Sequence, residues 1–228
     1  MHNGAVTPFD SATTLEPTGD GTYRWQVPDG WQQGRGAWGG LAIGAMVRAV
    51  GQVEPDASRS VRSISLQMTS PAYVGIHMVS VRPARLGSRL STWSVEVASE
   101  SGEQVASAQV VTGTARPTSA GRDESAWSPL TAPSAPAASS VPASPTPPPF
   151  PTFTRHCEYR VITGAPLHGG PAETLGWISL TSPPTWSDAV VLALSDAWYS
   201  VALVSQQRRL WSPDGRLVVD SLQTIVVG

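Results

Sequence analysis

The chain has 228 residues, 40% hydrophobic and 14% charged, with a formal net charge of −2. These values predict a globular protein and exclude the basic field that attracts nucleic acid or an anionic membrane surface. The single Cys157 excludes an internal disulfide and is typical of a reducing compartment. No apolar stretch approaches the ~18 residues of a membrane span and no signal-peptide pattern opens the chain, so we expect a cytoplasmic protein.

The first half predicts one helix followed by strands. Residues 1–22 are polar and are expected to form a loose lead-in, followed by a strand at Tyr23–Val27. Glycines then crowd around Trp38, where they allow a close approach of the backbone. The segment Leu41–Val50 is apolar on nearly every side, which predicts a buried helix.

Four strand patterns follow this helix and complete a first unit at residues 23–116. Glycines and Pro71 separate them, as hairpin turns require, and several alternate between apolar and polar residues. The expected strands are Arg62–Ser70, Ile76–Ala84, Ser91–Ser99 and Gln104–Thr112. One helix packed on one antiparallel sheet is the predicted result.

Residues 117–152 are rich in Pro, Ala and Ser and predict a linker with little to bury. The second unit, residues 153–228, repeats the first in outline. Its expected elements are strands Cys157–Ile162 and Leu175–Leu180, a helix Asp188–Val204, and strands Arg208–Trp211 and Arg216–Val227. Only two strands follow the helix here, whereas four follow it in the first unit. Each unit closes on a Ser-x-Gln, which supports a duplication.

Several segments together resemble the TesB-like acyl-CoA thioesterase family. They are Trp38–Ala42, Val61–Met68, Arg82–Arg89, Leu194–Ala197 and Trp211–Val218. The resemblance covers roughly residues 20–116 and 155–228. It implies an α+β double hotdog fold, in which an antiparallel sheet wraps a buried helix and the unit is duplicated. The second unit of this chain is short of strands for that fold.

The family hydrolyses acyl thioesters with an Asp on the second helix, a Ser or Thr on a following strand and a Gln on a late strand. Carried over by position, the resemblance implies that Asp196 and Gln223 are catalytic. The hydroxyl residue has no match, because Ser200 and Ser205 do not lie in the corresponding strand. A missing hydroxyl predicts a weak enzyme.

Each candidate residue also has a purely structural interpretation. A carboxylate among the apolar residues around Asp196 needs a partner, which suits either a structural cap or the orientation of water. Gln223 fits an outward-facing polar position equally well. Gly39 and Gly40, beside Trp38, open the first helix, where free N–H groups favour an oxyanion and glycine also permits close packing. We expect these three residues to contact substrate.

The pair His156 and Cys157 is poorly arranged for a thiol nucleophile, because adjacent strand residues point to opposite faces. No metal-binding spacing or cofactor motif is visible, so we expect neither. The sequence therefore predicts a homo-oligomeric hydrolase of fatty acid metabolism that acts on acyl-CoA or an acyl-carrier thioester. A non-catalytic acyl-thioester binding or scaffold protein and a poorly folding, incomplete product are the alternatives.

Overall fold

The structure is a computed structural model that describes residues 6–115, 133–146, 150–165, 173–182, 184–199, 206–214 and 217–223. The first unit forms α1 (Pro8–Ala12), β1 (Leu15–Gly19), β2 (Thr22–Val27), β3 (Gln32–Gln33), β4 (Gly36–Ala37), α2 (Gly39–Val53), β5 (Ser60–Met68), β6 (Gly75–Leu86), β7 (Leu90–Ser99) and β8 (Gln104–Gly113). The later elements are η2 (Ala138–Ser140), η3 (Thr152–His156), β9 (Cys157–Thr163), β10 (Leu175–Leu180), α3 (Asp188–Leu194), β11 (Gln206–Trp211) and β12 (Leu217–Gln223).

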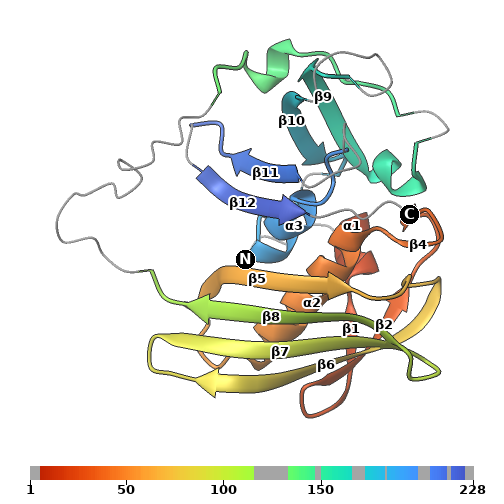
Figure 1. Ribbon diagram of the computed structural model, residues 1–228, viewed down its shortest axis with the longest axis vertical. Coiled ribbons are helices and arrows are strands. Elements are labelled where there is room, and N and C mark those ends of the chain that lie inside the picture. The colour runs from red at the N-terminus through yellow and green to blue at the C-terminus, as the bar shows by residue number, and fades with distance from the viewer. Residues whose placement is uncertain are drawn as a thin grey trace.

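A six-stranded antiparallel sheet in the order β1-β2-β6-β7-β8-β5 supports the first unit. Its strands alternate as the sequence predicts: along β7, Ser91, Trp93, Val95 and Val97 are buried and the residues between them are less so. Helix α2 lies across the buried face of this sheet (Figure 1). The sheet thus supplies one wall of the core and the helix fills it.

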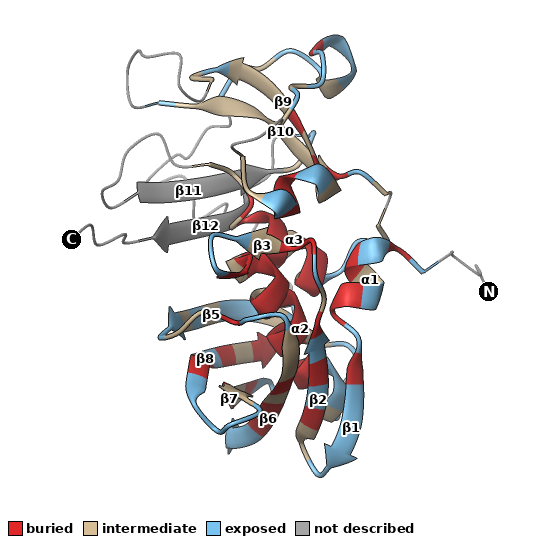
Figure 2. Ribbon diagram, turned by 90° about the vertical axis from the view of Figure 1, so that its right-hand side faces the viewer, coloured by how far each residue is buried: buried red, intermediate tan, exposed pale blue. Residues whose placement is uncertain are grey.

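Helix α2 is buried on both sides because α3 and the second unit cover the face that the sheet leaves open. Leu41, Ala45, Met46 and Val50 are at most 1% exposed, and Figure 2 shows α2 and α3 as the buried centre of the molecule. An all-apolar helix is stable only in such a setting. The α+β hotdog fold expected from the sequence is confirmed.

The second unit is short of strands, as expected. Its described strands form two separate pairs, β9 with β10 and β11 with β12, instead of one wide sheet. In Figure 1 these pairs lie on the side of α3 away from the six-stranded sheet. The two units therefore meet across α2 and α3.

The expected lead-in at residues 1–22 is ordered over much of its length, which corrects the prediction. Thr7 and Asp10 form a capping box that begins α1, and Phe9 is 2% exposed in the core. Strand β1 pairs with β2 at the sheet edge, where Pro17 is tolerated. A five-residue helix and a strand that contains Pro are too short or irregular for periodicity to reveal.

Part of the proposed linker packs on the second unit. The indole of Trp177 donates to the carbonyl oxygen of Pro136 at 3.0 Å. The amide of Ser144 donates to the carbonyl oxygen of Tyr159 at 2.7 Å. Val141 between them is 8% exposed. Residues 133–146 therefore act as more than a spacer, while residues 117–132 and 147–149 of the expected linker lie outside the described part.

His156 joins the second unit to the first. Its ring stacks on Trp31 at 3.8 Å between centroids with an angle of 4° between planes, and its Nε2 lies 3.1 Å from the carbonyl oxygen of Gly30. Burial lowers the pKa of His156 below its ordinary value of 6.5; Arg155 adds to the lowering and the contact with Gly30 opposes it.

This lowered pKa predicts a loss of stability in mild acid. The unfolded chain binds the proton more readily, so stability is complete above about pH 6.5 and falls as the pH drops through the folded-state pKa. His156→Phe keeps a ring on Trp31 and removes the titration. We expect the melting temperature of the variant to fall less than that of the native chain when the pH is lowered from about 7 to about 5. Burial also lowers the pKa of His77, so part of the fall in melting temperature remains in the variant. An equal fall in the variant and in the native chain would contradict the assignment to His156.

Candidate active site at the start of helix α2

Two glycines begin helix α2. Trp38 is the N-cap residue, and its side chain makes no capping hydrogen bond. Gly39 and Gly40 follow as the first helical residues. The N–H groups of a helix start and the helix dipole both stabilise negative charge placed there.

Gly40 is required by the close approach of α3. A Cβ atom on Gly40 would lie 2.5 Å from the carbonyl oxygen of Ala193 and 2.2 Å from the ring of Trp38. Contacts this short are not found in proteins, so any side chain at this position would separate the two helices. The glycine here serves packing, as the structural interpretation expected, and this packing brings the end of α3 to the start of α2.

Asp196 lies in the turn that follows α3. The helix ends at Leu194. The prediction that it continues to Val204 is therefore wrong for residues 195–199. The amide of Asp196 instead donates to the carbonyl oxygen of Ala193 at 3.0 Å, which forms a tighter turn. The carboxylate faces Gly39: a Cβ on that glycine would lie 2.7 Å from Oδ2 of Asp196. The fold thus brings together Asp196, Gly39, Gly40 and Trp38.

Trp38 lies within this arrangement as a buried anchor. It is 0% exposed and stacks between Trp31 and Phe153. Its indole N–H donates to the main-chain carbonyl oxygen of Asp196 at 3.2 Å. The ring therefore contacts the candidate catalytic turn directly.

Gln223 is the last residue of β12 and pairs with Gln206 in the backbone register. The side chains of β11 and β12 lie outside the described part, as do Ser200 and Ser205. The catalytic role of Gln223 stays a prediction.

The thiol of Cys157 has the properties of a core group. It is 5% exposed, and burial raises its pKa to about 12, which Tyr159 slightly opposes. A thiolate is the nucleophilic form of cysteine and is scarce at such a pKa. This supports the rejection of a Cys157–His156 pair.

A cavity of ≈ 500 Å³ lies at the opposite end of α2 from Asp196. Val50, Glu54 and Thr112 contribute to its wall, together with Asp188 at the start of α3. The two helices run in opposite directions, so this cavity and the Asp196 turn lie at different ends of the helix pair. We assign the candidate catalytic site by the position of Asp196 and not by this cavity.

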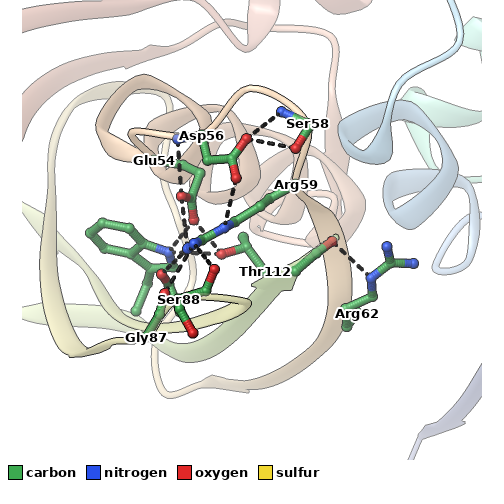
Figure 3. Close-up of polar contacts among 11 residues, drawn as sticks. Glu54, Asp56, Ser58, Arg59, Arg62, Gly87, Ser88 and Thr112 are labelled. Carbon is green, nitrogen blue, oxygen red and sulfur yellow. Dashed lines mark hydrogen bonds and ion pairs between the residues drawn. The ribbon is translucent and has the colours of Figure 1, made fainter. Parts of the chain in front are cut away.

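A buried ion pair between Glu54 and Arg59 lines the same cavity and was not expected from the sequence (Figure 3). Glu54 and Arg59 are 5% and 8% exposed in their side chains, and Nη1 of Arg59 lies 3.3 Å from Oε1 of Glu54. Arg59 also donates to Ser91 Oγ at 2.6 Å and to the carbonyl oxygens of Gly87 and Ser88 at 3.0 and 3.1 Å. The arrangement ties the end of α2 to the hairpin between β6 and β7.

Gly39→Ala tests the contact between α2 and Asp196. The backbone of Gly39 is not in the left-handed region, so Ala fits the helix and only the space facing Asp196 is lost. A displacement of about 1 Å can cost roughly 10²-fold in rate, and we expect a loss of turnover of that order with little loss of melting temperature. Gly51→Ala is the matched control in the same helix, because a Cβ there meets nothing within 4 Å. Equal turnover in the two variants would contradict the assignment.

No helix in the described part of the chain is long and apolar enough to cross a membrane. Within the same residues, no group of three or more His, Cys, Asp or Glu side chains is placed to hold a metal ion.

Comparison with known proteins identifies the first unit. Residues 27–115 match the model of the acyl-CoA thioesterase N-terminal domain. A hotdog-fold protein of unknown function from Alicyclobacillus acidocaldarius is similar in structure, with 18% identity, a TM-score of 0.79, and coverage of 96% of this chain and 99% of that one. The acyl-CoA thioesterase II TesB2 from Mycobacterium marinum has 16% identity, a TM-score of 0.69, and coverage of 94% and 96%. No curated protein matches the sequence.

Proposed function

We propose that this chain, whose residues 27–115 match the acyl-CoA thioesterase N-terminal domain, hydrolyses an acyl-CoA or a related acyl thioester. The observation that carries the proposal is the Asp196 carboxylate that faces Gly39 at the start of α2. A base and a group of amide donors at one point are the two elements that water attack on a thioester needs.

The reaction follows from this geometry. Asp196 accepts a proton from water as the water oxygen bonds to the thioester carbonyl carbon. The carbonyl oxygen becomes an oxyanion, which the N–H groups at Gly39 and Gly40 stabilise. The carbon–sulfur bond then breaks, the thiolate leaves and takes the proton that Asp196 holds, and a carboxylic acid and a free thiol result. Water is the only co-substrate.

Gln223 has the role of orienting the water in this proposal. A side-chain amide both donates and accepts hydrogen bonds, so it suits a water that must present one lone pair to the carbon and one proton to Asp196. Trp38 contributes by its contact with the Asp196 turn. The proposal includes a homo-oligomer, because β5 is an edge strand of the sheet in the described part.

A non-catalytic acyl-thioester binding protein is the second candidate. The observation that favours it is the absence of a Ser or Thr at the position that the family uses. A water held by Asp196 and Gln223 alone loses one hydrogen bond and reacts more slowly. In this reading the start of α2 would bind the thioester carbonyl without cleaving it.

Release of free thiol from short-, medium- and long-chain acyl-CoAs tests the proposal. We expect thiol release from at least one chain length to exceed the rate measured without protein. Binding of an acyl-CoA without thiol release by the folded protein would favour the second candidate. A chain that neither binds nor cleaves any member of the panel would exclude both.

A further inference from the structure

The turn that carries Asp196 is held at two consecutive carbonyl oxygens by side chains from both units. The indole N–H of Trp38 donates to the carbonyl oxygen of Asp196 at 3.2 Å. The hydroxyl of Tyr159, on β9, donates to the carbonyl oxygen of Ala197 at 2.8 Å. Neighbouring peptide groups are thereby fixed from two directions.

Both donors are themselves immobile. Trp38 stacks on Trp31 with centroids 6.2 Å apart and 12° between planes, and on Phe153 with 4.8 Å and 5°. Tyr159 is 3% exposed and its ring lies 5.8 Å from that of Trp198. A donor locked by packing holds its acceptor more firmly than a surface side chain can.

Tyr159 stays a donor across the working pH range. Burial raises the pKa of its hydroxyl strongly, and the charges of Cys157 and Asp196 act in the same direction. The phenol therefore keeps its proton around neutral pH.

The backbone hydrogen bonds at Asp196 and Ala197 span only three residues each. Helix α3 ends at Leu194, and the amides of Asp196 and Ala197 donate to Ala193 and Leu194 at 3.0 and 3.1 Å in single tight turns. Rotation of the peptide groups on either side of the Asp196 Cα would swing the carboxylate away from Gly39. The two carbonyl contacts oppose this rotation.

We propose that Trp38 and Tyr159 are positioning residues that hold the Asp196 carboxylate at the start of α2. They act on the carboxylate through the backbone of the turn. The effect on turnover rests on the proposed function, whereas the effect on the turn does not. Tyr159 comes from the second unit and Trp38 from the first, so the site is complete only when the two units are packed together.

Tyr159→Phe is the sharpest test because it removes one hydroxyl and leaves the ring. Loss of one of two contacts permits a smaller shift than a full 1 Å displacement, so we expect kcat to fall about 10-fold with KM within about twofold. Tyr199→Phe is the matched control: its hydroxyl donates to the carbonyl oxygen of Gly164 at 2.9 Å, away from the Asp196 turn. We expect that control to keep kcat within about twofold of the native value.

Trp38→Phe is the second test, with Trp25→Phe as its control. Trp25 is also 0% exposed, and its indole donates to the carbonyl oxygen of Ala12 at 2.9 Å. Both variants lose ring area and one hydrogen bond, so both lower the melting temperature. When turnover is measured at a temperature well below the melting temperatures of both variants, only Trp38→Phe is expected to lower kcat.

Hydrogen exchange of the Asp196 and Ala197 amides gives a readout that needs no turnover. We expect faster exchange at these amides in Tyr159→Phe and Trp38→Phe than in the two controls. Unchanged exchange, or equal kcat losses in each variant and its control, would overturn the positioning role. A native chain without turnover would overturn the proposed function, and the exchange rates would still decide whether the two rings hold the turn.

Discussion

Arg59→Met is expected to lower the free energy of unfolding by about 3–5 kcal/mol, the usual result of removing one partner from a buried ion pair. The cause is the charge left behind. Glu54 is 5% exposed, and its second carboxylate oxygen accepts hydrogen bonds from the indole of Trp93 at 3.2 Å and from the hydroxyl of Thr112. These two neutral donors remain in the variant, but the cation that balances Glu54 is lost. The carbonyl oxygens of Gly87 and Ser88 lose their donor as well.

Urea unfolding measures this loss, and two further variants interpret it. Arg24→Met breaks the exposed pair with Glu16, whose side chains are 45% and 68% exposed, and is expected to cost less than about 1 kcal/mol. Glu54→Gln combined with Arg59→Met removes the stranded charge and is expected to recover part of the stability. A double variant no more stable than Arg59→Met alone would show that lost packing, and not the charge, is the cause.

Periodicity predicted the regular elements of the first unit well. The apolar segment Leu41–Val50 could only be a buried helix, and the strands after it alternate in the way that a half-buried sheet imposes. The helix in the second unit was placed correctly at its start, Asp188, where the N-cap residue Ser187 accepts a hydrogen bond from the amide of Val190. Its end was not predicted, because the apolar residues after Leu194 continue the pattern although the chain turns.

The site was predicted only in part, because contacts between distant residues leave no local pattern. Motif order suggested Asp196 and Gly39, which are 157 positions apart, and the structure places them in contact. Tyr159 carries no such signal: an aromatic residue on a strand predicts core packing, and its hydroxyl contact with Ala197 depends on how the two units meet. Glu54 and Arg59 are close in sequence, but their burial and the contacts of Arg59 with Gly87 and Ser88 depend on how the hairpin between β6 and β7 packs at the end of α2 (Figure 3).

Asp196→Asn tests the central claim most directly. The amide keeps the shape of the side chain and cannot accept a proton from water, so the general base is lost while the fold is kept. We expect thiol release from the best acyl-CoA to fall by about 10²–10⁴-fold, the range that a positioned general base contributes. Asp20→Asn, in the exposed turn between β1 and β2, is the control for the same chemical change.

The measurement to make first is therefore thiol release by the native chain, Asp196→Asn and Asp20→Asn with the same acyl-CoA panel. The account predicts turnover in the native chain and in Asp20→Asn and its collapse in Asp196→Asn, with equal melting temperatures for all three. Turnover in Asp196→Asn equal to that of the native chain would contradict the account and place the catalytic base elsewhere in the molecule.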